Sequence, residues 1–223
     1  AAHTESVALG TSSIVLPLRH PLHVAKSAAS VDRLSDGRLV LGVASGDRDP
    51  EYPAFGVDPE NRGQLVRESV DALRALWREE YPTLEGSWGQ IDGELDVLPK
   101  PTTDTLPLFP TGNARQSTEW IAENGDGWIF YHLPESTLES YLDTWRGHAP
   151  QKPFTIALQV EFADDPTAEP EPLHLGYRAG VEWFREYFRR LDDYGLDHVI
   201  VGLRAAEPAA AMTTFASEVI EEL

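Results

Sequence analysis

The sequence predicts an α/β protein built on parallel strands, either a (β/α)-barrel or a doubly wound sheet. Three observations favour this class. Short apolar runs alternate with helical stretches along the 223 residues. The run over residues 39–43 is apolar throughout, which is typical of a strand buried on both faces of a parallel sheet. Several of these runs end in glycine and hydroxyl residues, and α/β proteins bind ligands at such strand ends.

Six strand-then-helix units follow one another along the chain. The first is a strand over Val7–Leu16 and a helix over Pro21–Leu34, which Asp36-Gly37 ends. The other units, in chain order, are strand Arg38–Ser45 and helix Arg62–Glu80, strand Leu106–Thr111 and helix Gln116–Asn124, strand Gly127–Tyr131 and helix Pro134–Trp145, strand Phe154–Phe162 and helix Ala179–Tyr194, and strand His198–Leu203 and helix Pro208–Leu223.

Three segments between these elements carry turn-forming residues. Prolines at three positions predict a loop over Gly46–Asn61, and a loop rich in proline and acids covers Asp164–Pro172. Residues 81–106 predict an irregular excursion or a small hairpin. The length suits one sizeable core, so we expect a single domain over residues 1–223.

Composition narrows the chemistry and the compartment. The chain has no cysteine, which excludes disulfides, thiolate metal sites and a cysteine nucleophile. No apolar run of about 18 residues is present, so we expect no membrane span. The amino terminus lacks a basic region followed by a long apolar run, and we therefore expect a cytoplasmic protein.

The charge is strongly acidic, with 37 Asp and Glu against 18 Lys and Arg and a formal net charge of −19. Only Lys26, Lys100 and Lys152 are lysines. A diffuse acidic surface repels phosphate backbones, so nucleic acid is not an expected partner. An acid excess with scarce lysine suits a salt-loaded cytosol, where ions screen self-repulsion. A halophilic source is the interpretation we favour, and an acidic protein of ordinary origin is the alternative.

Several motifs carry a resemblance to a known family. They are LGT, LPLRHP, DRLSDGR and LGVASGD in the first two units, and LPKP, DGW and HLGYRAG further on. Through them the chain resembles the luciferase-like flavin monooxygenases, and in particular the luciferase-type oxidoreductases. The resemblance implies a (β/α)₈ TIM barrel in which about two further βα units precede the Val7–Leu16 strand. We therefore expect this chain to lack that first quarter, and the Val7–Leu16 strand to have no strand partner on its amino-terminal side.

The resemblance also implies a function. An FMN-dependent monooxygenase oxidises a small organic substrate with oxygen and reduced flavin, which a separate reductase supplies. A homodimer is expected. One alternative is hydride transfer with the deazaflavin coenzyme F-420, and another is a non-catalytic protein that only binds flavin.

The first candidate cofactor contact is the strand end at Gly10, Thr11 and Ser12. Small residues let backbone approach a flat ring closely. In the family the corresponding strand end carries a bulge, often with a non-prolyl cis peptide, behind the flavin ring. A simple β-bulge is the alternative. Ser45 ends the next strand, where a hydrogen bond to the flavin or a plain helix-entry turn fits equally. Bacterial luciferases carry an arginine near this position.

The turn after the Leu106–Thr111 strand is the candidate phosphate site. Backbone N–H groups at a helix start, a capping side chain and an arginine together suit a phosphate. The family resemblance places the FMN phosphate at this turn, and the alternative is an ordinary helix cap without a ligand. The residues concerned are Gly112, Asn113, Ala114, Arg115 and Ser117.

Two further residue types are candidates for the site. His20 or His23, after the Val7–Leu16 strand, is a candidate acid or base, and of the two we favour His20. A structural histidine is the more common outcome. Arg178, expected in the loop before a helix, is placed to bind the flavin phosphate or an anionic substrate, or to pair with a carboxylate. No HExxH, GxGxxG, GxSxG or P-loop motif is present, so we predict no metal site.

Overall fold

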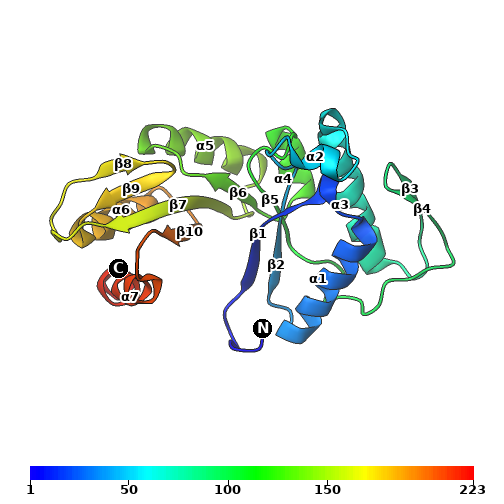
Figure 1. Cartoon of the computed structure of the whole chain (residues 1–223), viewed down its shortest axis with the longest axis horizontal. Coiled ribbons are helices and arrows are strands. Elements are labelled where there is room, and N and C mark those ends of the chain that lie inside the picture. Colours follow the sequence, from blue (N-terminus) through cyan, green and yellow to red (C-terminus); the bar gives the residue numbers. More distant parts are fainter. The chain divides into compact units, whose positions relative to one another are not determined.

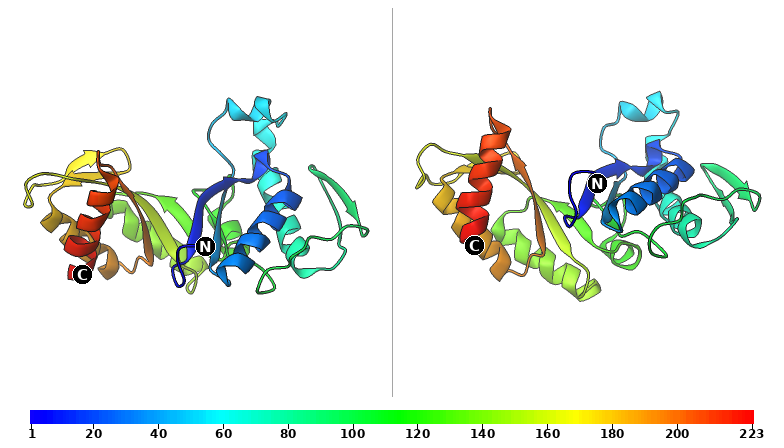
Figure 2. Two further views of the ribbon diagram at one scale, coloured as in Figure 1. Left: turned by 60° about the horizontal axis from the view of Figure 1, so that its bottom comes forward. Right: turned by 90° about the horizontal axis from the view of Figure 1, so that it is seen from below.

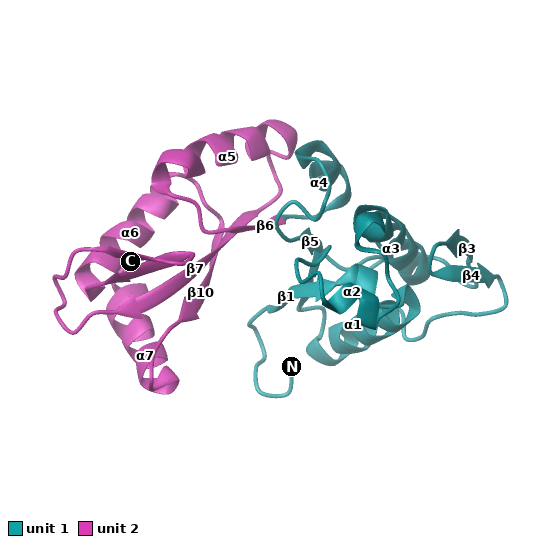
Figure 3. Ribbon diagram, turned by 45° about the horizontal axis from the view of Figure 1, so that its top comes forward, with its two compact units in different colours: residues 1–127 teal, residues 128–223 magenta.

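The computed structural model describes residues 1–223 as two compact units, Ala1–Gly127 and Trp128–Leu223 (Figure 3). Each unit contains parallel strands joined through helices. The order of the predicted strands and helices is that of the sequence analysis. No helix combines the length and the apolar character that a bilayer crossing requires.

A parallel sheet forms the centre of the first unit. Strands β1 (Leu9–Val15), β2 (Leu39–Ala44) and β5 (Leu108–Pro110) lie in the order β1-β2-β5. Leu9 pairs with Leu39, and Leu41 pairs with Leu108. Strand β1 pairs with β2 alone and is an edge strand, as predicted. The exposed side chain of Val7, with 60% of its surface accessible, lies just before it.

Two helices pack on one face of this sheet (Figures 1 and 2). They are α1 (Pro21–Ser35) and α3 (Arg62–Arg78), and their apolar stripes share one core with Leu39, Leu41 and Val43 of β2. Side chains alternate along a strand, so Gly10, Val40, Gly42 and Ala44 belong to the opposite face. The two faces differ, because leucine and valine side chains of β2 line the first, whereas the second has glycine at Gly10 and Gly42.

The remaining elements of the first unit are short. A 3₁₀ turn, η1 (Leu16–Leu18), follows β1, and α4 (Thr118–Asn124) follows β5. The predicted loop at residues 46–61 contains α2 (Glu51–Ala54) and a 3₁₀ turn, η2 (Pro59–Asn61). The prolines that suggested an irregular loop fit these short helices, since proline is tolerated in a first helical turn.

The excursion at residues 81–106 contains the small hairpin that was one of the two predictions. Its strands are β3 (Thr83–Gly86) and β4 (Gly89–Asp92), which pair antiparallel. The chain then returns along α1, where buried Asp32 accepts hydrogen bonds from the Thr102 N–H and hydroxyl, both at 2.7 Å. Asp32 therefore has a structural partner.

The second unit holds a five-stranded sheet with β7 (Phe154–Phe162) at its centre. On one edge β7 pairs with β10 (His198–Leu203). Two shorter strands share its other edge. Residues 154–157 of β7 pair with β6 (Trp128–Tyr131), and residues 159–162 pair with β9 (Gly176–Ala179), both in parallel. β8 (Glu171–Leu173) adds antiparallel to β9.

Helices cover the second sheet and complete the unit. They are α5 (Glu135–His148), α6 (Val181–Asp193) and α7 (Pro208–Thr214). A π turn over Phe215–Val219 and a 3₁₀ turn over Ile220–Glu222 end the chain, where a continuous helix was predicted. Buried aromatic rings fill the core, with Trp128 and Phe154 in edge contact at 5.2 Å between centroids.

The β8–β9 hairpin differs from the sequence prediction, which placed a loop before a helix at Ala179. The helix begins at Val181, and residues 176–179 form a strand. Gly176 explains the close pairing, since a Cβ atom there would stand 1.9 Å from the Gln159 carbonyl oxygen. β9 occupies the sheet edge that β6 leaves when the chain turns away after Tyr131.

Candidate cofactor-binding site

The face of the first sheet opposite α1 and α3 carries Gly10 and Gly42 beside the larger Val40 and Phe109. A Cβ atom added to Gly10 would meet no atom within 4 Å. The β1–β2 register shifts between Thr11 and Ile14, and the Ser12–Ser13 peptide bond is cis. The Thr11 hydroxyl donates to the Gly42 carbonyl at 2.9 Å and ties the bulge to β2. The bulge predicted at this strand end is therefore present, and open space lies over Gly10.

A buried tyrosine holds the turn after β2 in place. Tyr52 of α2 is fully buried, and its hydroxyl donates to the Ser45 carbonyl. Gly46 has φ +86°, and an added Cβ would stand 2.6 Å from the Tyr52 hydroxyl. Burial raises the pKa of Tyr52, and the neighbouring Arg62 guanidinium offsets part of that shift. The phenol therefore stays protonated and holds the Ser45 turn in place. Ser45 itself is 8% exposed.

The turn after β5 has an unusual backbone. Ala114 and Arg115 both have positive φ, +45° and +58°, which is uncommon for residues other than glycine. The Gln116 side chain secures the turn, because its amide donates to the Gly63 carbonyl at 2.7 Å. Asn113 is exposed, and Gly112 at the start of the turn has φ +57°. The turn thus packs against the first residues of α3.

Ser117 is the N-cap of α4. Its oxygen accepts a hydrogen bond from the Trp120 N–H at 3.2 Å, and the helix begins at Thr118, two residues later than predicted. The side chain is exposed and keeps its own hydroxyl proton for donation. The five residues of the predicted phosphate site therefore lie together in one turn. Whether they bind a phosphate stays a prediction.

Two buried polar atoms at these strand ends have no hydrogen-bond partner. One is the Thr111 hydroxyl, directly after β5, and the other is Nε of Arg62 at the start of α3. The Thr111 N–H bonds to the Val43 carbonyl at 2.7 Å, so Thr111 lies beside the end of β2. Unsatisfied buried polar groups are costly, and a polar ligand would satisfy them. The residues present at this end of the sheet fit a flat ring that carries a polar or anionic side chain.

His20 lies on the other side of the sheet, at the start of α1. Its Nδ1 accepts a hydrogen bond from the Leu22 N–H at 3.3 Å, which makes it the helix N-cap. It also lines a cavity of about 500 Å³ between β1, β2 and α1 and a second of about 290 Å³ under Trp88. Neither cavity lies on the Gly10 face. The capping contact is structural, and the predicted catalytic role of His20 stays a prediction.

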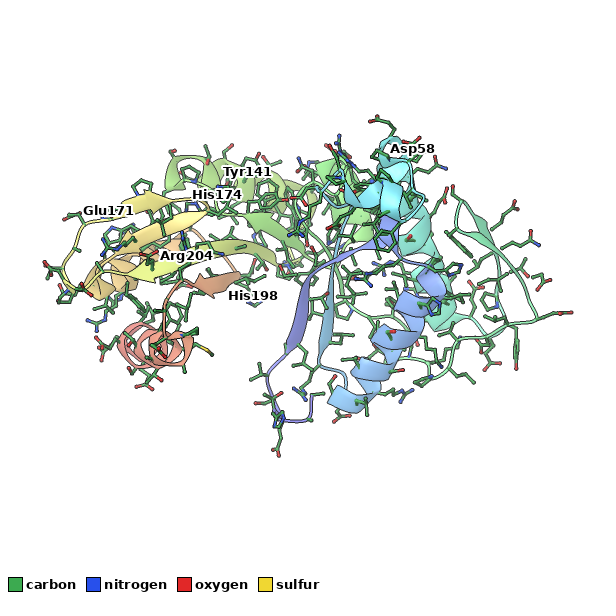
Figure 4. The ribbon with its side chains drawn as sticks, viewed as in Figure 1. Asp58, Tyr141, Glu171, His174, His198 and Arg204 are labelled. Carbon is green, nitrogen blue, oxygen red and sulfur yellow. The ribbon has the colours of Figure 1, made fainter.

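Arg178 lies in a strand of the second unit, whereas the sequence analysis expected it in a loop. It lies in β9, and its guanidinium contacts the carboxylates of Glu161 and Glu171 at 3.4 Å each. Glu161 also faces Arg204, which follows β10, at 3.9 Å. Arg204 and Glu171 are labelled in Figure 4. Carboxylate pairing, the alternative given for Arg178, is what the structure contains. Arg178 is paired in this way because β9 lies next to β7, which places Arg178 beside Glu161.

A second polar cluster in this unit escaped the sequence analysis. His132 follows β6, and its Nε2 lies 3.2 Å from the Tyr187 hydroxyl. Burial lowers the pKa of His132 and raises the pKa values of Tyr177 and Tyr187. Arg190 stands over the Tyr187 ring at 5.5 Å and bonds Glu135 through two nitrogens. These side chains come from the residue after β6, from the two helices α5 and α6 and from β9, so no local motif marks the cluster.

The fold and the small-residue strand ends define a class of α/β protein with a ligand face at the carboxyl ends of parallel strands. Comparison with known proteins identifies the family within that class. The model of the luciferase-like monooxygenase family matches residues 1–171, and the chain belongs to this family. The resemblance carried by the sequence motifs is thereby confirmed.

Two curated relatives illustrate the range of chemistry in similar proteins. The oxygenase component of a flavin-dependent trigonelline monooxygenase from Acinetobacter baylyi is 36% identical over 110 residues, which is 48% of this chain and 28% of that protein. An F420-dependent glucose-6-phosphate dehydrogenase from Beutenbergia cavernae is 34% identical over 133 residues, 58% of this chain and 39% of that protein. The chain spans less than half the length of the curated relatives that it matches.

A solved structure supports the fold over the whole chain. An F420-dependent secondary alcohol dehydrogenase in complex with an F420-acetone adduct superposes with a TM-score of 0.81 at 19% identity. The match covers 99% of this chain and 81% of that one. Together with the family match, it confirms the predicted luciferase-like TIM-barrel fold class.

Tyr52 and Arg62 lie next to the candidate turn at Ser45, and the sequence analysis did not single them out. Tyr52 lies inside a segment with three prolines, and Arg62 is one of several charged residues at a helix start. An aromatic residue between prolines was the available signal, since a large aromatic side chain is more often packed than left in a structureless loop.

Proposed function

We propose that the protein binds FMN on the Gly10 face of the first sheet and acts as a flavin-dependent monooxygenase. The observation that carries the proposal is the open space over Gly10. The partnerless Thr111 hydroxyl after β5 supports it, since a polar ligand at the strand ends would satisfy that group. Family membership and the named monooxygenase relative support the same chemistry.

Different residues contact different parts of the cofactor in this proposal. Gly10, Thr11 and Ser12 lie behind the ring, where small residues admit a flat π-system. Ser45, which Tyr52 fixes, lies at the polar side of the ring. The turn of Gly112, Asn113, Ala114, Arg115 and Ser117 receives the phosphate at the end of the ribityl chain.

The cofactor, when bound in its reduced form, supplies the electrons that activate oxygen for transfer to a small organic substrate. The chain's own part is to orient the ring, to hold the phosphate and to keep water away from the reacting face. A separate reductase delivers the reduced flavin in this proposal. A homodimer belongs to the same proposal. Acid-base chemistry at His20 would require a substrate that reaches the α1 side of the sheet, where His20 caps the helix.

Hydride transfer with the deazaflavin coenzyme is the second candidate. A specific observation favours it, because a relative at 34% identity is an F420-dependent dehydrogenase. Both cofactors carry a tricyclic ring and a ribityl phosphate, so the same residues serve either one.

The test compares the two cofactors directly. The purified chain is titrated with FMN and with the deazaflavin coenzyme, and binding is read from fluorescence quenching. Reduced FMN is then supplied chemically, and oxygen uptake is followed with and without protein. The monooxygenase proposal expects FMN binding and an altered rate of oxygen uptake. Binding of the deazaflavin alone would favour hydride transfer, and binding without any redox effect would favour a flavin carrier. If neither cofactor binds, the proposed function is wrong.

A further inference from the structure

A cavity of about 290 Å³ lies at the carboxyl end of β1, away from the Gly10 face, and we call it the Trp88 cavity. Its lining residues come from η1, the start of α1, the loop after α2, α3 and the β3–β4 hairpin. The volume is at the lower end of the range for small-molecule sites, so the cavity suits a small ligand. The apolar part of the lining consists of Leu16, Pro17, Leu18, Phe55, Val57 and Leu65.

The β3–β4 hairpin forms one wall of this cavity and is fastened to α3 (Figure 1). The N–H and the hydroxyl of Ser87 donate to the Glu68 carboxylate at 2.7 and 3.1 Å. The Trp88 indole lies against Gly86, where an added Cβ would stand 2.5 Å from Nε1. The ring of His20 meets the indole edge to face at 5.6 Å between centroids. The wall is therefore held by specific contacts.

Three polar groups that line the cavity have donors without a partner in the protein. Ser69 of α3 is only 3% exposed, and its hydroxyl makes no hydrogen bond within the chain. Nε1 of Trp88 is buried and has no hydrogen-bond partner. Nδ1 of His20 accepts the Leu22 N–H, so the neutral ring carries its proton on Nε2. Buried donors without partners are costly, and the oxygen atoms of a ligand would satisfy them.

The charge of the lining favours an anion. Arg19 lines the cavity, is exposed, and has no carboxylate partner within 4.0 Å. No Asp or Glu lines the cavity, although 37 of the 223 residues are acidic. The field of a chain with net charge −19 repels anions over most of its surface, so a local cation without acids is selective.

We propose that the Trp88 cavity binds a small aromatic carboxylate at a site separate from the cofactor face. The ring of the ligand packs on the apolar walls, where the rings of Phe55 and Trp88 offer edge-to-face contacts. Its carboxylate accepts two parallel hydrogen bonds from the Arg19 guanidinium. The remaining lone pairs of the carboxylate face the donors of His20 and Trp88.

The experiment measures binding of benzoate and of benzyl alcohol, which has the same ring without the charge. Each is titrated into the cofactor-free 223-residue chain at fixed ionic strength, and the indole N–H resonance of Trp88 is followed by NMR. The variant Trp88→Phe assigns this resonance among those of the six tryptophans. The test variants are Arg19→Gln and Ser69→Leu. Arg78→Gln is the control, because Arg78 is also exposed and lies at the far end of α3.

Benzoate should shift the Trp88 resonance saturably, with a dissociation constant of about 1 mM for a ligand of this size. Benzyl alcohol should bind about 3- to 10-fold more weakly, since it lacks the charge-assisted pair with Arg19. Arg19→Gln should remove this difference and leave benzyl alcohol within about 2-fold of wild type. Ser69→Leu fills the cavity and should abolish binding of both. Arg78→Gln should bind both as wild type does.

Three results would each overturn the proposal. They are no saturable shift at Trp88, equal affinity of wild type for the two ligands, and an unchanged preference for benzoate in Arg19→Gln. If Arg78→Gln loses the preference as Arg19→Gln does, the attraction is general and the site is likewise wrong. Should Ser69→Leu fail to fold, Arg19→Gln still decides, because an exposed arginine is replaced without loss of the core. FMN is absent throughout, so the outcome is independent of the proposed function.

Discussion

Replacing Gly10 by valine should separate folding from cofactor binding. Gly10 lies within β1 and pairs with Val40. Its neighbours Leu9 and Thr11 pair with Leu39 and Leu41, which face α1, so position 10 faces the other way. An added Cβ meets no protein atom within 4 Å. The valine side chain would therefore stand in the space that we assign to the flavin ring.

The two expected effects have opposite signs. Glycine inside a strand costs about 0.5–1 kcal/mol through its extra freedom in the unfolded chain, and valine favours strands. The free energy of unfolding should thus stay constant or rise by up to about 1 kcal/mol. Steric conflict with a ligand of fixed position costs about 1–3 kcal/mol, which corresponds to about a 5- to 150-fold loss of FMN affinity.

Urea unfolding of the cofactor-free protein measures the first effect, and fluorescence titration with FMN measures the second. Gly147→Ala is the matched control, because Gly147 of α5 is also a glycine with no atom within 4 Å of an added Cβ. It should leave FMN affinity unchanged. If Gly10→Val folds as wild type and binds FMN equally well, no ring lies against this face, and the site is misplaced.

Three further outcomes are expected. Gly46→Ala places a Cβ 2.6 Å from the Tyr52 hydroxyl on a left-handed backbone with φ +86°. The free energy of unfolding, measured in urea, should therefore fall by about 2–5 kcal/mol. A fall below about 1 kcal/mol would contradict the packing of this turn. Burial holds the pKa of His132 below its ordinary value, so the unfolded chain takes up the proton first as the pH falls below about 6.5, and stability declines there. His132→Gln should show a smaller fall in melting temperature between about pH 7.5 and 5.5, and an identical fall would remove His132 from the acid response. The net charge of −19 should make the melting temperature climb between about 0.01 and 1 M KCl, where the Debye length contracts from about 30 to 3 Å, and a flat response would end the halophile interpretation.

The fold was predictable where periodicity and turn residues agree. The apolar run of β2 and the amphipathic stripe of α3 each predict a single type of element, and both elements lie where they were expected. The β8–β9 hairpin was missed because its strands are short and follow a segment rich in acids and proline. Its stability comes from pairing with β7, in which Gly176 allows close contact with Gln159, and a single sequence does not show such a partner.

The candidate site was predictable only in part, for a related reason. Glycine and hydroxyl residues near apolar runs are visible in the sequence, so Gly10, Ser45 and the turn at Asn113 could be proposed from it. Tyr52 and Arg62 act through contacts across the fold, and neither lies in a motif. Arg178 shows the converse, because a plausible anion-binding residue proved to be paired with two carboxylates.

A crystal structure of this chain with bound FMN tests the central claim most directly. The account predicts the isoalloxazine ring against the face of Gly10 and the register shift at Ser12, with the phosphate at the Asn113–Ser117 turn. The deazaflavin coenzyme should occupy the same place if it is the ligand. A ring bound instead in the cavity between β1 and α1, or a phosphate held at Arg178, would contradict it.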